Sequence, residues 1–447
     1  MNPRLRTARD LPRAAMIGAL LLAGTVADLL ADAPPAQSAP FEAHYLDREQ
    51  ATPLAPRPEV LAMRHIVLHY DKGTYCGHPR MVLFQHFRDD EIIVGHFHAP
   101  CRYQEYADVR HVNYQNRGVL LLQRSTNGGE TWPKEAEQVL FDNTWSAERK
   151  RAFLSQGLAG RGSYDMFQSD SVFLFGQTYL TSEYEKEVPP CFMLRSADRG
   201  RTFEKVPTVI RHPQGPTYRL TRHNTPVIRM PDGKTLLAAF QMADEPGPLR
   251  EAEPAVFVST DNGATWRLFS RPVVDRSGQG SFHYPTLFVR PDGELQCYAL
   301  HIAKKDEVVA GMRNAIVLVK SRDGGRTWSE PVPIVGKGGD CWKNPHGEGV
   351  IYRSPYPIAL RDGRILLVFA RRRMPGGIGG IVSRDNGQTW SEEFVLRDDG
   401  EWWDLGYPVG CQLRDGRILV IYYFPVQDGN GQGGTRSIAG TFFRLGE

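Results

Sequence analysis

The sequence lacks the features that define several common protein classes. Only six cysteines occur in 447 residues and none forms a CxxC pair, which argues against a disulfide scaffold or a zinc ribbon. The formal net charge is +3 with no basic block, so we expect no nucleic-acid partner. After residue 40 no apolar run reaches the roughly 20 residues of a spanning helix, so we expect no membrane insertion of the mature chain.

The first 39 residues differ in composition from the rest. Four arginines within the first 13 positions precede an apolar stretch at 14–27, and small residues and prolines follow. This order is typical of a secretory signal peptide, cleaved between Ala27 and Ala39. The alternative, a membrane anchor, requires a longer apolar run. We therefore expect a secreted or periplasmic protein.

A repeated motif is the strongest pattern in the chain. Each copy reads Ser-x-Asp/Asn-x-Gly-x-Thr, followed by Trp or Phe. The acidic or amide side chain accepts backbone N–H bonds, the glycine supplies a positive φ, and the aromatic residue begins the next strand. The motif therefore predicts a turn between two strands. The five copies begin at Ser125, Ser196, Ser259, Ser321 and Ser383.

A second pattern, Asp-Gly between apolar runs, indicates another hairpin in each unit. It occurs at 232–233, 292–293, 362–363 and 415–416. Two hairpins per unit give four strands, and six units begin near His78, Tyr164, His223, His283, Tyr356 and Tyr407.

Six four-stranded units predict an all-β protein, a six-bladed β-propeller with antiparallel blades. We expect the propeller to span 59–447 and residues 40–58, rich in proline and alanine, to form a linker. A spare strand within Glu59–Tyr70 is expected to close the ring by pairing with the last blade.

The repeated motifs resemble the Asp boxes, or BNR repeats, of the sialidase (neuraminidase) superfamily, over residues 60–447. The resemblance implies a sialidase-like propeller and an exo-acting glycoside hydrolase. Asp boxes are signatures of the fold, so they predict architecture more directly than chemistry.

In a propeller the first strand of each blade is innermost, so residues that enter it line the central channel. This predicts a polar funnel, although hydrogen bonding at the rim would explain any one of its side chains equally well. A long insertion at 96–111 adds further polar residues. The predicted substrate-binding residues are His78, His98, His111, Tyr164, Asp165, His223, His283, Tyr284, Tyr356 and Asp404.

The resemblance also implies catalytic roles. Tyr407 stands eight residues before Asp415, which is similar to the place of the tyrosine nucleophile of sialidases. Asp108, in the long insertion, matches the acid/base aspartate. The implied clamp for a substrate carboxylate consists of Arg80, Arg371 and Arg372.

The chain departs from the sialidase pattern at three points. Gly77 stands where the first arginine of the clamp is expected, and Arg80 follows Pro79 instead. A third clamp arginine is not evident from the motif, and Arg353 and Arg436 are the alternatives for it. The glutamate that normally partners the tyrosine is unplaced, and Tyr284 or Tyr356 stands at its expected position.

These observations leave three functional hypotheses. The first is a hydrolase that removes an acidic terminal sugar from a glycan. The second is a lyase that cleaves a uronate-containing glycan by β-elimination, and the third is a glycan-binding propeller without activity. We expect no cofactor and no metal, because His96 and His98 point the same way along a strand but lack a third ligand at a recognisable spacing.

Overall fold

The computed structural model describes residues 55–157, 161–181, 186–248, 250–278, 280–303, 314–336, 352–372 and 375–446. These residues belong to one compact unit of the chain. At 111–113, 222–225, 303 and 314 the description covers the backbone only. The signal peptide predicted for residues 1–39 and most of the predicted linker at 40–58 lie outside the described residues.

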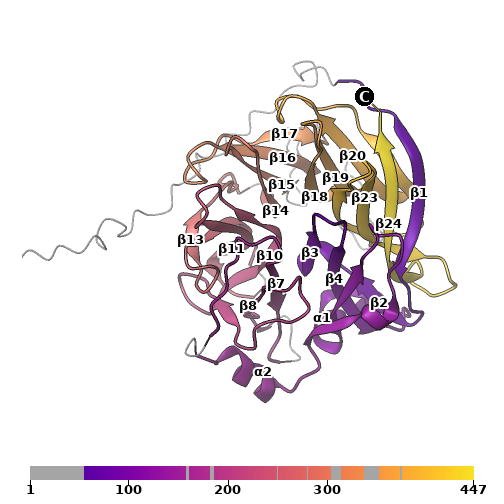
Figure 1. Ribbon diagram of the computed structural model, residues 1–447. Coiled ribbons are helices and arrows are strands. Elements are labelled where there is room, and N and C mark those ends of the chain that lie inside the picture. The colour runs from indigo at the N-terminus through magenta and orange to yellow at the C-terminus, as the bar shows by residue number, and fades with distance from the viewer. Residues whose placement is uncertain are drawn as a thin grey trace, which may run out of the picture. The chain divides into compact units, whose positions relative to one another are not determined.

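The strands form six antiparallel sheets arranged as blades around a common centre, which confirms the predicted propeller (Figure 1). Blade 1 contains β2 (Thr74–Gly77), β3 (Leu83–His86), β4 (Ile92–Pro100), β5 (Val119–Ser125) and β6 (Gln138–Asp142). Blade 2 contains β7 (Val172–Gln177), β8 (Cys191–Ser196) and β9 (Thr208–Ile210). Blade 3 contains β10 (Tyr218–Arg229), β11 (Leu236–Pro246), β12 (Glu253–Ser259) and β13 (Arg267–Ser270).

The other three blades repeat the four-stranded plan. Blade 4 contains β14 (Gly280–Val289), β15 (Leu295–Ala303), β16 (Asn314–Ser321) and β17 (Val332–Val335). Blade 5 contains β18 (Tyr352–Ala359), β19 (Ile365–Arg371), β20 (Gly376–Ser383) and β21 (Phe394–Gly400). Blade 6 contains β22 (Gly406–Gln412), β23 (Ile418–Val426), β24 (Thr435–Leu445) and β1 (Val60–His69).

The first strand of the chain closes the ring. β1 pairs in antiparallel fashion with β24, from Val60 opposite Leu445 to His69 opposite Ile438. The blade formed by the C-terminal strands is thus completed by the N-terminal one, as the spare strand predicted. Closure thus joins the two ends of the propeller within one blade.

Helices are few and lie in the connections. They are the α-helices α1 (His111–Arg117) and α2 (Ala147–Leu154) and the 3₁₀ turns η3 (Pro79–Met81), η4 (Tyr106–Val109) and η5 (Lys134–Ala136). In the described part of the chain, none of the helices combines the length and apolarity needed to cross a membrane.

All five boxes form the predicted turn between the third and fourth strands of a blade. In each copy the serine Oγ accepts a hydrogen bond from the glycine N–H, and the Asp or Asn oxygen accepts from the threonine N–H. The box glycines have φ between 75° and 91°. Because strands alternate in direction, these turns and the Asp-Gly turns lie at the same end of the blades, which we call the box end.

The core lies between neighbouring blades. Trp266, from the box of blade 3, packs its ring against Phe173 and Phe175 of blade 2, with ring centroids 6.1 and 6.2 Å apart. A Cβ on Gly263 would lie 2.7 Å from the Phe173 ring, so this turn approaches its neighbour as closely as glycine allows.

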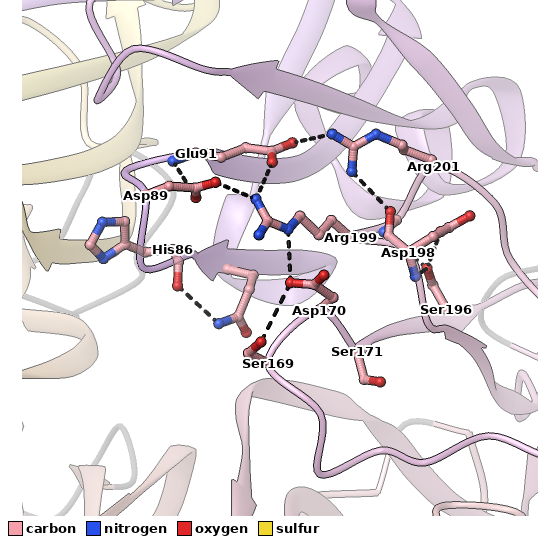
Figure 2. A network of polar contacts seen from close by, with 12 residues as sticks. His86, Asp89, Glu91, Ser169, Asp170, Ser171, Ser196, Asp198, Arg199 and Arg201 are labelled. Atoms are coloured by element: carbon pink, nitrogen blue, oxygen red, sulfur yellow. Dashed lines mark hydrogen bonds and ion pairs between the residues drawn. The ribbon is translucent and has the colours of Figure 1, made fainter.

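Charged side chains also join blades 1 and 2 at the box end (Figure 2). Arg199, in the box of blade 2, contacts Asp89 at 2.6 Å, Glu91 at 2.7 Å and Asp170 at 2.8 Å. Arg201 reaches Glu91 at 3.1 Å from the same box. The hairpin between β3 and β4 is thereby tied to the next blade.

Two blades depart from the regular plan. In blade 1 the inner strand is divided into β2 and β3 by η3, and both pieces pair with β4. In blade 2 the box follows β8, so β7 occupies the second position, and residues 161–171 form no inner strand. The sequence predicted an inner strand near Tyr164, and the structure corrects this register.

Candidate functional site

The inner strands are bulged at residues that each stand directly before a proline. His78, Tyr284, Ser354 and Tyr407 have φ values of 59°, 54°, 53° and 51°, in the left-handed region. The strand register shifts at the corresponding points of β14, β18 and β22. A bulge re-aims side chains, and positive φ is uncommon for residues other than glycine. The strain therefore marks this ring of positions, which we call the funnel end, as a candidate site.

Tyr407 on β22 and Tyr284 on β14 meet across the ring. Their ring centroids are 5.5 Å apart and the rings meet edge to face. Burial and the neighbouring Tyr284 raise the pKa of Tyr407 above its usual value, while Arg353 and Arg372 oppose that rise. Tyr407 is therefore a neutral phenol in the free protein.

Arg353 on β18 extends this pair into a chain of three groups. Its Nη1 donates a hydrogen bond to the Tyr284 hydroxyl oxygen. Its guanidinium carbon lies 5.2 Å from the centre of the Tyr284 ring, within the range of a cation–π contact. A positive charge is thus held against the hydroxyl of the tyrosine that contacts Tyr407.

His283 is held in a single tautomer. Gln241 on β11 accepts from the Tyr284 N–H at 3.1 Å and donates to the Ala252 carbonyl at 2.9 Å, which fixes its amide orientation. Its Nε2 then donates to Nδ1 of His283 at 3.2 Å, so the His283 proton is on Nε2, 2.6 Å from Ser281 Oγ. Burial, and then Arg353, lower the pKa of His283 to about 3. Both ring nitrogens are engaged, so His283 positions its neighbours.

Arg80 lies beneath the bulge of β14. It is fully buried, and its Nη2 donates to the carbonyls of Tyr284 at 2.8 Å and Pro285 at 3.1 Å and to the Thr286 hydroxyl. Burial lowers its pKa to about 10, against the raising effect of Tyr407 and other phenols. Arg80 therefore supports the backbone that presents Tyr284.

Asp404 organises a second buried cluster behind Tyr407. It accepts from the Tyr423 hydroxyl at 2.6 Å and from Arg436 Nε at 3.2 Å, and Arg372 lies 3.9 Å away. Arg372 also donates to Tyr423 at 2.8 Å, and its guanidinium carbon is 6.0 Å from the Tyr407 ring centre. One carboxylate thus faces two guanidinium groups, which leaves excess positive charge beside Tyr407.

His78 completes the packing around Tyr407. Its ring lies 4.4 Å from that of Tyr407 and 4.8 Å from that of Tyr423, measured between centroids. Tyr114 on α1 contacts its Nε2 at 3.4 Å. These aromatic groups give Tyr407 a low-dielectric environment, which strengthens the electrostatic effects of the nearby arginines on it.

A polar cavity of about 240 Å³ opens onto Tyr407 and Tyr284. Residues of blades 2, 3, 4 and 6 contribute to its wall. The lining residues are Met81, Gln115, Gln177, Tyr179, Glu187, Pro189, Arg219, Thr221, Gln241, Pro248, Glu251, Ala252, His283, Tyr284 and Tyr407. A larger cavity of about 420 Å³ beside α2 has a mostly apolar wall and includes none of the predicted site residues.

The structure brings together about half of the residues predicted from the sequence. Tyr407, Tyr284, His283, His78, Arg80, Arg372 and Asp404 form the connected set described above. Tyr356 is buried against Phe84 beside Arg80, and the bulge of its strand falls at Ser354 instead.

Other predicted residues have partners outside this set. Arg371 pairs with Glu393, and Asp108 accepts from the backbone of Gln104 and Glu105 within its own loop. Tyr164 packs over Arg195 and Asp165 accepts from the Phe167 N–H, because this segment precedes the second strand of its blade.

Three histidines complete the predicted set. His98, on β4, lies 3.8 Å from Asp71. The side chains of His111 and His223 lie outside the described residues.

Sequence reasoning missed Gln241, Arg219 and Glu251 as lining residues. Gln241 lies on β11 and Glu251 lies between β11 and β12, away from the inner strand. Arg219 lies at the start of the inner strand β10, which begins at Tyr218, before the start that the sequence predicts near His223. Arg353 could have been predicted from the sequence, since it stands directly before Ser354, the bulge residue that precedes a proline.

Comparison with known families decides the assignment of the fold. Residues 121–420, more than half of the chain, match the family described as BNR repeat-like domain. The chain belongs to this family. A search of curated proteins finds no match.

Solved structures share this BNR repeat-like propeller. A protein of unknown function from Dyadobacter fermentans superposes with a TM-score of 0.62 at 20% identity, covering 86% of this chain and 99% of that one. The Hadza microbial sialidase Hz136 gives 0.52 at 19% identity, covering 82% and 65%. The leech intramolecular trans-sialidase, complexed with 2,7-anhydro-Neu5Ac, gives 0.55 at 12% identity, covering 85% and 70%. Identities of this size show a shared sialidase-like fold.

Proposed function

We propose that this protein is a carbohydrate-active enzyme, a glycoside hydrolase that removes an acidic terminal sugar from a glycan. The observation that carries the proposal is the row of contacts at the cavity wall, from Tyr407 to the ring of Tyr284 and from the Tyr284 hydroxyl to Arg353. Strained, bulged backbone holds both phenols in place. Both phenols line the polar cavity, a position that a purely structural contact between blades would not require.

The size of the cavity supports action at the end of a glycan. Its volume of about 240 Å³ is below the roughly 300–1,000 Å³ typical of sites for drug-sized ligands. One sugar unit fits such a space better than several consecutive units. We therefore propose an exo-acting enzyme.

The charges around the cavity favour a sugar that carries a carboxylate. Arg219 lines the wall, Arg353 lies behind Tyr284, and Arg372 lies behind Tyr407. Guanidinium groups bind carboxylates with two parallel hydrogen bonds, so Arg219 is the group that we assign to direct recognition. The complex of the leech neighbour with 2,7-anhydro-Neu5Ac, an acidic sugar, is consistent with this class of substrate.

In this proposal Tyr407 attacks the anomeric carbon and the bond from that carbon to the leaving oxygen breaks. The Tyr407 proton passes to the Tyr284 oxygen while the Tyr284 hydroxyl releases its own proton to solvent in the cavity. Water then hydrolyses the glycosyl–tyrosine bond and returns Tyr407 to its starting state. Because a phenol is a weak nucleophile near neutral pH, the negative charge that develops on the pair needs stabilisation, and Arg353 and Arg372 supply it. Tyr284 thus takes the place that a carboxylate occupies beside the sialidase tyrosine. His283 and Arg80 act as positioning residues.

We assign the acid that protonates the leaving oxygen to Glu251. Two carboxylates line the cavity, and Glu187 already accepts from the Leu180 and Thr181 N–H groups. Glu251 is exposed at the cavity. Asp108, the candidate from the sequence, caps a turn in its own loop, so we rank it second for this role.

One observation favours the second hypothesis, β-elimination on a uronate. Tyr407 is a neutral phenol whose ring contacts that of another tyrosine, Tyr284, and paired tyrosines suit proton transfer at carbon as well as attack on it. The two reactions differ in their products. Hydrolysis adds water to the cleaved bond, whereas elimination leaves an unsaturated sugar that absorbs ultraviolet light.

The test is a screen of sialosides and uronate-capped oligosaccharides, followed by mass spectrometry and ultraviolet absorbance. On the active substrate, Tyr407→Phe should lower kcat by at least about a hundredfold, because only the reacting hydroxyl is removed. Tyr356→Phe is the matched control, since that tyrosine is equally buried near Arg80 but does not line the cavity. Binding without turnover across the whole screen would leave only the glycan-binding alternative.

We also propose that the enzyme acts outside the cytoplasm, as the leader at residues 1–39 predicts. Mass spectrometry of the N-terminus after expression with the full leader should find residues 1–27 removed. An intact Met1 on a cytoplasmic product would contradict export.

A further inference from the structure

Three potential metal ligands converge where the two ends of the ring meet. A ring nitrogen of His69, the Sγ of Cys76 and a ring nitrogen of His98 all lie within 4.8 Å of one another. His69 and Cys76 are buried, and His98 is one-quarter exposed. The cluster is separate from the Tyr407 cavity, whose lining includes none of these residues.

The topology of the first blade explains this convergence. Cys76 on β2 and His98 on β4 are directly opposed in the antiparallel ladder, so their side chains leave the same face of the sheet. His69 is the last residue of β1, which belongs to blade 6. Its ring lies 5.2 Å from that of His98 and meets it edge-on. The cluster therefore joins the closing strand of the ring to the first blade.

Hydrogen bonding prepares His69 to act as a ligand. Its Nδ1 lies 2.9 Å from a carboxylate oxygen of Glu137, so Nδ1 carries the proton. Gln123 donates to the same carboxylate at 3.2 Å and to the Leu68 carbonyl at 3.4 Å, which fixes Glu137 in place. A carboxylate behind a histidine is the usual second shell of a metal-bound imidazole, because it orients the ring and increases its basicity.

The remaining nitrogen of His69 is a buried lone pair that no neighbour satisfies. The side chain is 4% exposed, and Nε2 has no hydrogen-bond partner among the described residues. His96, whose ring is 5.2 Å from that of His69, also has a buried Nε2 without a partner there. Buried polar atoms are nearly always paired, so unpaired nitrogens beside a buried thiol indicate a missing ligand.

We propose that His69, Cys76 and His98 bind a first-row transition metal ion, with zinc as the best fit. Two imidazoles and one thiolate form a borderline-soft donor set suited to Zn²⁺. Tetrahedral bond lengths place zinc ligands about 3.3–3.6 Å apart, so ligand atoms that lie within 4.8 Å of one another would move together by up to about 1.5 Å on binding. Asp71, half-exposed and 3.8 Å from His98 Nε2, or water supplies the fourth ligand.

In this proposal the metal has a structural role and stabilises the closure of the ring. It links β1, which pairs with the C-terminal β24 in blade 6, to β2 and β4 of blade 1. Binding converts the Cys76 thiol to a thiolate and releases its proton to solvent, with no change in oxidation state. Because the folded state alone brings these three ligands together, binding stabilises it.

The first experiment measures the metal in the full-length protein. Protein purified without chelators is expected to contain about one zinc ion per chain. Removal with a chelator should lower Tm by about 5 °C or more, and added Zn²⁺ should restore it. Co²⁺ added to the metal-free protein should give visible bands of tetrahedral cobalt and a thiolate-to-cobalt band in the near ultraviolet. Protein that holds no transition metal, and that shows neither a Tm shift nor a cobalt spectrum, overturns the proposal.

Matched variants assign the ligands. Cys76→Ser should abolish the thiolate-to-cobalt band, whereas Cys411→Ser, at another buried free cysteine, should retain it. His69→Gln should weaken cobalt binding, and His65→Gln on the same strand should not. A thiolate band that persists in Cys76→Ser overturns the site.

Should Cys76→Ser fail to fold, alkylation of the wild-type protein decides between the same outcomes. Zn²⁺ should slow the modification of Cys76, mapped by mass spectrometry, and leave that of Cys411 unchanged. Equal rates of Cys76 alkylation with and without Zn²⁺ overturn the proposal.

Discussion

The box end and the funnel end of the propeller use polar side chains in opposite ways. At the box end each turn satisfies its backbone groups with side chains from within the same eight residues. At the funnel end, donors of Arg80, Arg353 and Arg436 are buried without a partner among the described residues. The first arrangement stabilises the fold, and the second keeps hydrogen-bonding capacity unused at a cost in stability.

The two ends also differ in how far apart in sequence their contacts are. A box hydrogen bond joins residues four positions apart, such as Gly263 and Ser259. The contacts of the funnel end join blades that are distant in the chain, such as Arg353 with Tyr284 and Arg80 with Pro285. Stability is thus built from local, repeated units, while the site depends on closure of the whole ring.

The largest effect expected at the box end is the loss of an aromatic contact between blades. Trp266→Ala should destabilise the protein by about 3 kcal/mol, because its ring fills the space beside Phe173 and Phe175. Thermal and urea unfolding measure the change. Trp266→Phe is the control, since it keeps an aromatic ring and the indole N–H has no partner among the described residues. Equal melting temperatures for Trp266→Ala and the wild type would remove this contact from the account of the fold.

The corresponding change at the funnel end is Arg80→Lys. A lysine keeps the charge but cannot reach the Tyr284 and Pro285 carbonyls with one planar group, so about 2 kcal/mol of stability should be lost. Because Arg80 positions Tyr284, kcat on the active substrate should fall more than KM rises. Arg371→Lys is the control, since Arg371 is one-third exposed and pairs with Glu393. A pure increase in KM would indicate that Arg80 contacts the substrate directly.

The box end could be predicted from the sequence because its chemistry is local. Serine, aspartate, glycine and threonine at fixed offsets define one turn, and five copies define the number of blades with Asp-Gly hairpins between them. Closure by β1 followed from one unpaired apolar segment at Glu59–Tyr70. These inferences needed no knowledge of which blades touch.

The funnel end could be predicted only in part. The tyrosines before Pro285 and Pro408 were visible as a pattern, but the contact between the Tyr284 and Tyr407 rings depends on bulges that no local signal specifies. In blade 2, residues 161–171 form no inner strand, so Tyr164 and Asp165 do not lie at the start of one as predicted. Glu251 lies in the connection between the second and third strands of blade 3, which strand starts do not predict, and Arg219 was missed because β10 begins at Tyr218, earlier than the predicted start near His223.

The buried carboxyl group of Glu253, beside the cavity, allows the loss of folding stability from a buried polar group at the funnel end to be measured. Burial raises the pKa of Glu253 from 4.5 to about 7. Since the folded state binds the proton more tightly than the unfolded state, this contribution to stability is complete below about pH 4.5 and is lost as pH rises through 7. Glu253→Gln, which resembles the protonated acid, should match the wild type at pH 5 and be about 2 kcal/mol more stable at pH 8.

Urea unfolding at the two pH values tests this, with Glu294→Gln as the control of opposite sign. Burial tends to raise the pKa of Glu294, but hydrogen bonds from Gln296 and Arg290 outweigh it and lower the pKa. Its ionised form therefore stabilises the fold above about pH 4.5 and loses that contribution only below it, so Glu294→Gln should be destabilised to nearly the same extent at pH 5 and at pH 8. The same pH trend in both variants would contradict the assignment of Glu253.

The smallest effects are expected within the ion-pair network of the box end (Figure 2). Arg199 contacts three carboxylates and its side chain is 24% exposed, whereas Arg201 contacts Glu91 and is 54% exposed. Surface pairs contribute little, so Arg201→Gln should cost about 0.3 kcal/mol and Arg199→Gln about 1 kcal/mol. Both costs should shrink in 1 M salt (about a 3 Å screening length), and more completely for Arg201. Equal costs that salt does not change would mean that packing of the arginine stems, and not charge, joins blades 1 and 2.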